Sequence, residues 1–267
     1  MTLRKTPFPA RQAAGPAGGT LGGFFPNPGY GLGIGGMRLH DDFLGPISKT
    51  GINTELPWAV SDFSGTGIDC TAVYGTASEL GVLQAYTGNN ANSGGNVAIS
   101  SVRFAGGMPV GLAVACKVRA GAAPASLDIT VWSGLISVLT TEVSTAANLS
   151  FIGVRAIQIG ANVNWFGVVK DGSTGANEST VDLGYVYDST WRSFGWRRTS
   201  TGIQFFEIDA SKISRYGYLT TDIGAEVTTN IPTADLRPVA VGIHNGPTGS
   251  QHEVEIDYFT AAGTIAR

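Results

Sequence analysis

Three carboxylates alternate along one short stretch near the end of the chain, and they are the residues best placed to do chemistry. Residues 252–260 read HEVEIDYFT and carry Glu253, Glu255 and Asp257. Because residues two apart in a strand lie on one face, Glu255 and Asp257 are expected to be neighbours. Glycoside hydrolysis uses two carboxyl groups that flank the scissile bond, about 5–5.5 Å apart in retaining enzymes. The simpler interpretation, a solvated strand face, is the one that the sequence favours.

Other catalytic and cofactor motifs are absent from the sequence. His40, His244 and His252 do not have the spacing of metal ligands. Residues 31–36, GLGIGG, match the G-x-G-x-x-G string, but no predicted strand precedes them and no predicted helix follows. The chain has no P-loop, no G-x-S-x-G and no Cys/His pair. We therefore expect no nucleotide site and no bound cofactor.

Aromatic side chains offer a different chemistry, the stacking of sugar rings. Polar loops at 87–96 and 171–178 would supply hydrogen bonds to such a ligand. The alternative is that the rings fill a hydrophobic core, which is the commoner place for tryptophan in a sandwich. The candidate stacking residues are Trp58, Trp132, Trp165, Trp191 and Trp196.

Composition indicates many short strands joined by turns. Glycine contributes 38 of 267 residues, about twice the ordinary share, and charged residues make up only 14%. The net charge is −3 and no basic patch is evident, which argues against nucleic-acid binding. No apolar run approaches the length of a membrane span, and residues 1–15 do not resemble a secretory signal. Cys70 and Cys116 could pair, but two small buried side chains are the simpler interpretation.

The strongest structural signal is a hairpin over residues 191–209, WRSFGWRRTSTGIQFFEID. Aromatic and β-branched residues alternate on both arms around a turn at 199–202. Gly202 is expected to adopt positive φ in that turn. Further strands are predicted at the following positions: 38–45, 58–61, 67–73, 80–86, 97–104, 111–119, 127–139, 154–159, 163–170, 237–245 and 252–260. This spacing predicts one β-sandwich or jelly roll over residues 38–267.

Residues 1–37 differ from the rest because prolines alternate with glycine clusters. Such a segment cannot bury enough apolar surface to fold alone. We predict an extended assembly arm that packs on neighbouring subunits, with packing on its own domain as the alternative. Its apolar contacts would be made by Leu21, Phe24, Phe25, Tyr30, Leu32 and Ile34.

The order of these signals resembles the concanavalin A-like lectin and glucanase jelly rolls. The similarity lies in DDF at 41–43, the 191–209 hairpin, the strand at 238–245 and the closing VEIDYF at 254–259. Laminarinase-like glycosidases of this fold use an E-x-D-x-x-E strand with two catalytic glutamates. Here that string runs from Glu255 to Thr260, so a threonine replaces the second glutamate. This departure argues against hydrolysis.

The same resemblance implies a calcium site, because some members of the family hold Ca²⁺ between the first and last strands. Asp41, Asp42 and Asp257 are the candidate ligands. Calcium takes six to eight oxygen ligands, so three carboxylates are only part of a set.

A Gly/Pro-rich arm followed by a DDFLG strand also resembles tailed-bacteriophage virion proteins of this fold. We therefore predict a non-enzymatic, homo-oligomeric structural protein of the virion: a capsid decoration (cement) protein or a head or tail accessory protein. Its partners would be neighbouring copies or the major capsid protein. The alternative is a glycan- or receptor-binding module of a tail fibre or spike, and the third interpretation is a laminarinase-like glycosidase. Capsid or tail location and oligomer symmetry stay open.

Overall fold

The structure is a computed structural model of the 267-residue chain. It describes residues 36–41, 47–48, 51–52, 58–63, 69–73, 82–104, 108–121, 129–143, 148–159, 161–172, 177–214, 217–246 and 251–264. The predicted arm lies outside the described residues, except for its last two positions. Its apolar residues Leu21, Phe24, Phe25, Tyr30, Leu32 and Ile34 are therefore not placed.

Alternation of apolar and polar side chains folds the described chain into two antiparallel sheets, which confirms the all-β prediction. In spatial order, sheet 1 consists of β15 (Gly217–Val227), β14 (Ile203–Ser214), β13 (Arg192–Arg198), β8 (Ala113–Ala120), β17 (Glu253–Thr264), β6 (Val82–Tyr86) and β5 (Asp69–Val73), with β1 (Gly36–Asp41) also paired to β17. Sheet 2 consists of β12 (Glu178–Val186), β11 (Asn162–Lys170), β10 (Phe151–Ile159), β9 (Ile129–Ile136), β16 (Arg237–Asn245), β7 (Gly94–Ala98) and β4 (Ala59–Asp62). A separate small ribbon pairs β2 (Ile47–Ser48) with β3 (Gly51–Ile52).

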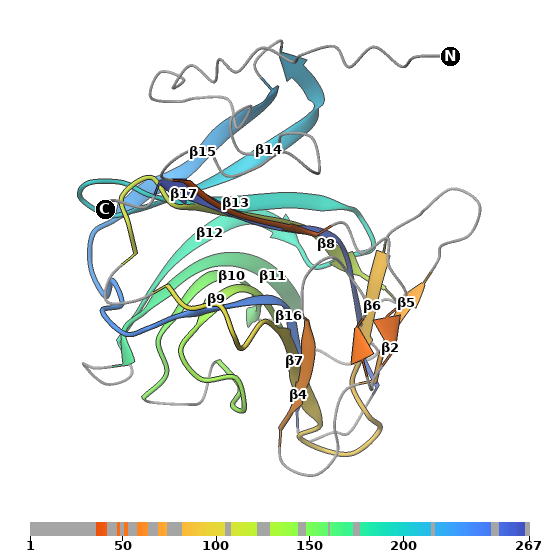
Figure 1. Ribbon diagram of the computed structural model, residues 1–267. Coiled ribbons are helices and arrows are strands. Elements are labelled where there is room, and N and C mark those ends of the chain that lie inside the picture. The colour runs from red at the N-terminus through yellow and green to blue at the C-terminus, as the bar shows by residue number, and fades with distance from the viewer. Residues whose placement is uncertain are drawn as a thin grey trace, which may run out of the picture.

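The sheets face each other as the two layers of a sandwich, with sheet 1 above sheet 2 in Figure 1. The chain passes repeatedly from one sheet to the other: β7 lies in sheet 2, β8 in sheet 1 and β9 in sheet 2 again. β1 pairs with the end of β17, so the first and last described strands are neighbours. These crossings are the connections of a jelly-roll sandwich. Among the described residues, no helix has the length and hydropathy needed to cross a membrane.

The inner faces of the sheets form one continuous hydrophobic core. From sheet 1, Phe194, Trp196 and Phe205 point inward and are essentially inaccessible to solvent. From sheet 2, Trp165 meets Phe194 with ring centroids 5.9 Å apart. The strand predicted at 111–119 is confirmed as β8, and its apolar alternation places Leu112, Val114, Cys116 and Val118 in this core.

Sheet 2 also buries its outer face, which the sequence did not predict. We call the apolar residues on this face the outer cluster; it contains Phe63, Ala98, Trp132, Ile136, Val143, Leu149, Phe151, Phe166, Val168 and Val239. Val143 and Leu149 come from the β9–β10 connection, residues 137–150. Trp132 stacks on Phe63 at 5.9 Å between centroids, and its Nε1 donates to Asn96 Oδ1 at 2.8 Å. The described parts of the connection, 137–143 and 148–150, therefore add a second hydrophobic layer to the sheet.

Polar contacts hold this connection in place at several points. Asn96 Nδ2 donates to the carbonyl of Leu139 at 2.7 Å, and Arg237 Nη1 donates to the carbonyl of Ser137 at 2.6 Å. The buried Lys170 donates from Nζ to the carbonyl of Val143 at 3.0 Å. Backbone polar groups that would otherwise be buried without partners are thereby satisfied.

A β-bulge at Asp257 corrects the predicted alternation of the closing strand. Ile256 pairs with Val118 of β8, but the next pair is Tyr258 with Lys117, so Asp257 is the extra residue. One extra residue inverts which side chains point inward. Phe259 therefore enters the core, whereas Tyr258 packs on the outer face of sheet 1.

The central hairpin is confirmed, with β13 and β14 joined by residues 199–202 and Arg198 opposite Ile203. The expected role of Gly202 was wrong, because it is not among the residues with positive φ. A Cβ at Gly202 would lie 2.3 Å from the carbonyl oxygen of Val227 on β15. The position requires glycine because a neighbouring strand comes close, not because of the turn.

Several strand boundaries also differ from expectation. β12 was missed altogether, and β7 begins at Gly94, inside the predicted 87–96 loop. The region after residue 209, expected to be irregular, continues as the long β14–β15 ribbon, which rises from sheet 1 in Figure 1. Polar alternation on an edge strand such as β12 gives little apolar signal.

Cys116 is a free, buried thiol, and burial raises its pKa to about 12. Two strands, β17 and β6, lie between its strand β8 and the strand β5 that carries Cys70. Strands are about 4.8 Å apart, so the two cysteines are too distant for a disulfide, whose Cα atoms lie within about 7 Å.

The outer cluster predicts that Gly242 cannot be replaced without loss of stability. A Cβ at Gly242 would lie 2.0 Å from the Trp132 ring and 2.4 Å from Asn96 Oδ1. We expect Gly242→Ala to lower the free energy of unfolding by about 1–3 kcal/mol, measured by urea denaturation, because the ring must shift. Gly184→Asn is the control, since Gly184 has φ +79° and open space around it, and asparagine tolerates that conformation. Equal midpoints for the two variants would contradict this packing.

Candidate functional site

The carboxylates of β17 lie on the outer face of sheet 1, and two of them are held in ion pairs. Asp257 Oδ2 accepts from Lys117 Nζ at 2.5 Å, and Glu255 Oε2 accepts from Arg119 Nε. Lys117 and Arg119 are two apart on the adjacent strand β8, so the pairs form two rungs across the strands. The sequence correctly placed these acids on one face, although the bulge changes their spacing.

Glu255 has partners on both of its oxygens. Gln84 Nε2 donates to its Oε1 at 2.5 Å, and Tyr86 O–H donates to Gln84 Oε1 at 2.5 Å. The Glu255 side chain is only 8% exposed. A catalytic carboxylate needs an oxygen directed at substrate, whereas both oxygens here are directed at neighbouring side chains.

In the folded chain, the position of the second glycosidase glutamate is occupied by Thr260, which has no carboxyl group. Thr260 is buried and donates from Oγ1 to the carbonyl of Leu39 on β1 at 3.0 Å. Glu253 is half-buried, and its pKa is raised by burial and then by the neighbouring charge of Glu255. The strand therefore holds a structural polar ladder with one carboxyl group of raised pKa.

Of the three calcium candidates, the structure describes only the side chain of Asp257. Asp257 is neutralised by Lys117. Asp41 pairs through its backbone with Phe259, but its side chain and all of Asp42 lie outside the described residues. Within the described part of the chain, no group of three His, Cys, Asp or Glu side chains is arranged to hold a metal ion.

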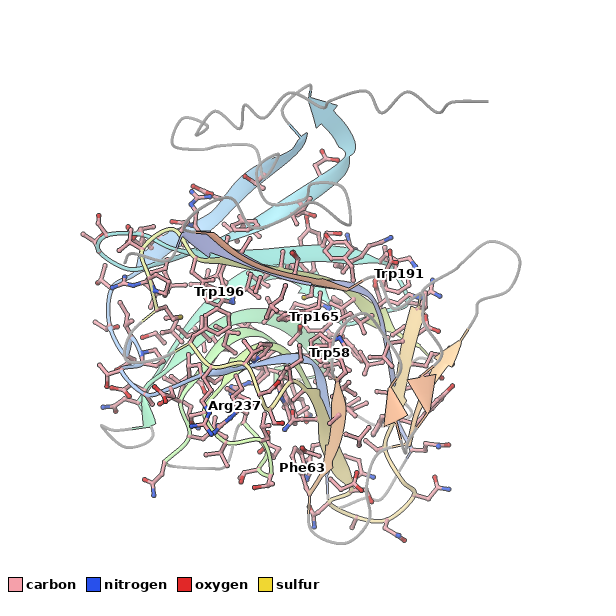
Figure 2. All side chains as sticks on the ribbon, viewed as in Figure 1. Trp58, Phe63, Trp165, Trp191, Trp196 and Arg237 are labelled. Atoms are coloured by element: carbon pink, nitrogen blue, oxygen red, sulfur yellow. The ribbon has the colours of Figure 1, made fainter. Side chains whose placement is uncertain are left out.

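Four of the five candidate stacking tryptophans are core residues, which corrects the prediction for them. Trp58, Trp132, Trp165 and Trp196 are each 3% exposed or less. Figure 2 shows Trp58, Trp165 and Trp196 between the sheets, with Trp191 at the periphery. Trp191 is partly exposed and remains the candidate for stacking on a ligand.

The polar loops proposed as ligand-binding are only partly described. The 87–96 loop is tied to the end of β16, because Asn245 Nδ2 donates to the carbonyls of Gly88 and Asn90, each at 2.9 Å. Most of the 171–178 loop lies outside the described residues.

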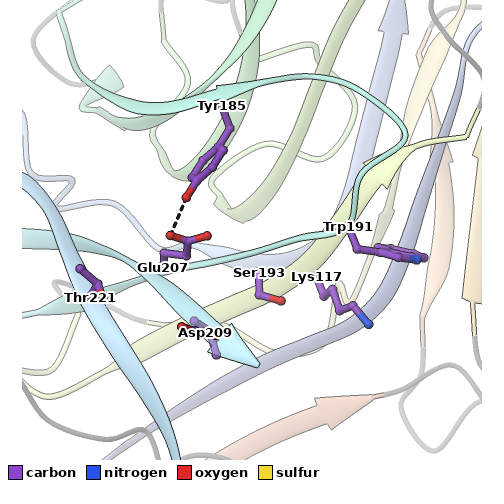
Figure 3. A pocket seen from close by; sticks show the side chains of 8 residues that line it. Lys117, Tyr185, Trp191, Ser193, Glu207, Asp209 and Thr221 are labelled. Carbon is purple, nitrogen blue, oxygen red and sulfur yellow. Dashed lines mark hydrogen bonds between the residues drawn. The ribbon is translucent and has the colours of Figure 1, made fainter. Parts of the chain in front are cut away.

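A pocket opens where the β14–β15 ribbon leaves sheet 1, and Trp191 lies at its rim (Figure 3). Its volume is about 530 Å³. It is lined by Lys117, Tyr185, Trp191, Ser193, Glu207, Ile208, Asp209 and Thr221. β13 begins at Arg192 while β14 continues past it, so the ribbon has no β13 neighbour beyond this point. Of these residues, Trp191 was a candidate from the sequence, whereas Glu207 and Asp209 were expected only as part of the hairpin.

Tyr185 joins the two sheets at this pocket. It comes from β12 of sheet 2, and its O–H donates to Glu207 Oε2 of β14 at 2.7 Å. This hydrogen bond, followed by burial and the charge of Glu207, raises the pKa of Tyr185, so the phenol stays protonated at neutral pH. The hydrogen bond fixes the position of Glu207, and its donor is a neutral group.

Sheet 2 carries a second charged cluster beside the outer cluster, which the sequence analysis also missed. Arg155 and Glu178 form a two-point ion pair with distances of 2.8 and 2.6 Å. Lys170 lies opposite Glu178 in the β11–β12 register, and burial lowers its pKa. These groups hold β10, β11 and β12 together beneath the β9–β10 connection, a structural role.

Comparisons with known proteins identify the fold. No protein-family model matches the chain, and no curated protein matches its sequence. A Shewanella oneidensis MR-1 protein of unknown function is similar in structure, with a TM-score of 0.54 and 14% identity over 87% of this chain and 89% of that one. Peanut lectin has a TM-score of 0.53 and 11% identity over 87% and 99%.

A β-1,3-1,4-glucanase (lichenase) from a mouse hindgut metagenome is also similar, with a TM-score of 0.49 and 12% identity over 86% of this chain and 100% of that one. At such identities the likeness shows a shared fold alone. The chain is a concanavalin A-like β-sandwich, as the resemblance in its sequence implied.

The ladder on β17 predicts that Glu255 stabilises the fold. We expect Glu255→Gln to lower the free energy of unfolding by roughly 1–3 kcal/mol, because Arg119 would keep a largely buried charge without its counter-ion. Asp222→Asn is the matched control: its ion pair with Arg197 lies on the same sheet, with side chains 40% and 28% exposed. An exposed pair of this kind contributes about 1 kcal/mol or less. Urea denaturation of both variants measures the difference, and a smaller loss in Glu255→Gln than in Asp222→Asn would contradict the structural role.

Proposed function

We propose that the chain is a non-enzymatic structural protein of a tailed-bacteriophage particle, a capsid decoration protein or a head or tail accessory protein. The observation that carries the proposal is the filled outer face of sheet 2. The outer cluster and the 137–150 connection occupy that face, and their buried rings are packed on glycines rather than arranged around a cleft. A surface built this way suits a rigid scaffold.

The arrangement of the acidic residues supports the same conclusion. Glycoside hydrolysis requires two carboxyl groups on either side of a bound sugar. On β17, Glu255 is bonded to Gln84 and Arg119, and Asp257 to Lys117. Using them in catalysis would require breaking two ion pairs between β8 and β17 and the hydrogen bond from Gln84 of β6.

The assembly role rests on residues 1–37. Their aromatic and aliphatic side chains are spaced along a Gly/Pro-rich segment that has no core of its own. Each large apolar side chain buried on a neighbour contributes about 1.5–3 kcal/mol, from which the ordering of the arm must be subtracted. In a closed oligomer every subunit both gives and receives such an arm, so the contribution is repeated at each interface.

Deletion of residues 1–37 tests this proposal. We expect the full-length protein to self-associate with rising concentration and the truncated chain to remain folded but at a constant lower mass, because the core formed by the described residues begins at Leu39. Light scattering gives the mass, and circular dichroism confirms the β-fold. Identical masses for the two chains at all concentrations would refute arm-mediated assembly.

Glycan recognition is the second candidate function, favoured by the partly exposed Trp191 at the rim of a pocket with carboxylate and hydroxyl groups. Sugars bind by stacking on such rings and by hydrogen bonds to such groups. In this case, saturable binding to a glycan array would be lost in Trp191→Ala and retained in Trp58→Phe, whose ring is in the core. Equal binding by both variants, or none by the wild type, would remove this candidate.

A further inference from the structure

The pocket between β13 and the β14–β15 ribbon presents negative charge at a fixed position. Glu207 and Asp209 lie two apart on β14 and both line it. Glu207 is held by the neutral O–H of Tyr185, as described above. Lys117 also lines the pocket, but Asp257 neutralises it at 2.5 Å. This end of the pocket therefore has the two acidic side chains of β14 and one guanidinium, that of Arg192 over the Tyr185 ring.

Two arginine side chains of the chain itself lie over the aromatic rings that line the pocket. The guanidinium of Arg119 lies 4.3 Å from the centroid of Trp191, and that of Arg192 lies 4.2 Å from the centroid of Tyr185. Arginine and lysine are attracted to aromatic faces, and arginine also binds carboxylates through two hydrogen bonds. These ring faces are covered by the chain's own arginines, so a basic side chain entering the pocket would meet the carboxylates of Glu207 and Asp209.

The sequence contains a segment with the complementary charge. All three charged residues within 1–37 are basic, namely Arg4, Lys5 and Arg11. The remainder of the chain has 14 basic and 20 acidic residues, which gives it a net charge of −6 against +3 for the arm. Attraction between arm and domain is thus built into the chain, and it is strongest at low ionic strength.

The length of the arm lets it reach another copy. β1 begins at Gly36 and lies beside β17, with β8 and β13 between β17 and β14. Residues 6–35, between Lys5 and Gly36, span at most ~100 Å when extended. This reach exceeds the width of one sheet of such strands, which are about 4.8 Å apart.

We infer that the Glu207–Asp209 pocket receives the basic end of the arm, Arg4, Lys5 and Arg11, from a second copy of this chain. This inference rests on the proposed function, because it gives the arm of an assembly protein its docking site. The aromatic and aliphatic residues 21–34 would then lie along the neighbour's surface on the way to the pocket.

The test compares two full-length variants that each lose two negative charges from the β14–β15 ribbon. Glu207→Gln with Asp209→Asn changes the pocket, whereas Asp222→Asn with Glu226→Gln changes β15 outside it. We expect the pocket variant to self-associate about 10- to 100-fold more weakly than the control variant, since charge-assisted contacts are lost. Light scattering at low and at high salt measures the association, and thermal unfolding confirms that both variants are folded.

A charge exchange makes the test specific. Glu207→Lys with Asp209→Lys should abolish self-association, and adding Arg4→Glu, Lys5→Glu and Arg11→Glu to the same chain should restore it. Restoration by this exchange requires the two segments to meet in the assembly.

Three outcomes would overturn the inference. If the pocket variant associates like its control while deletion of 1–37 still abolishes association, the arm docks elsewhere and the proposed function stands. If the deletion also leaves the mass unchanged, the proposed function fails as well. If the pocket variant loses binding to a glycan but keeps its self-association, the pocket is a glycan site.

Discussion

Burial of sheet 2 on both faces is the constraint on which the rest of the structure depends. Its inner face packs on sheet 1, and its outer face carries Trp132 stacked on Phe63 directly above Gly242. Because its outer face is also apolar, that face must be shielded from water as well. Val143 and Leu149 of the β9–β10 connection cover it. Asn96 links the Trp132 ring to the β9–β10 connection, because its side chain accepts from Trp132 and donates to the carbonyl of Leu139.

Charged groups lie on the outer face of sheet 1 and at its β14–β15 edge, and also on sheet 2 as the Arg155–Glu178 pair beside Lys170. On β17 the charges are paired across strands, and the bulge at Asp257 aligns that residue with Lys117 while turning Phe259 into the core. At the ribbon, β14 extends past the start of β13 and leaves a pocket lined by Glu207 and Asp209, in which Glu207 accepts from Tyr185 of sheet 2. The same architecture thus yields a rigid core, a neutralised ladder and one acidic recess.

The sequence predicted the features that depend on local alternation. The central hairpin, the β10–β11 hairpin and the β16 strand were recognised because aromatic and β-branched residues repeat every second position. It did not predict the bulge at Asp257, because one extra residue leaves no signal in composition. It did not predict the outer cluster either, because a strand that is apolar on both faces shows no period-2 alternation. Gly202 was assigned to the turn, although its contact with Val227 comes from a strand 25 residues away. The pocket was missed because Tyr185 and Glu207 belong to different sheets and meet only in the folded chain.

We propose that copies of this sandwich are joined by exchanged arms. Electron cryomicroscopy of the assembled full-length protein would test this arrangement most directly. We expect density for residues 1–37 leaving one subunit at β1, crossing to the next and ending at the recess between Trp191 and Glu207. Arms that fold back onto their own subunit, or assemblies joined through bare sheet edges, would contradict it.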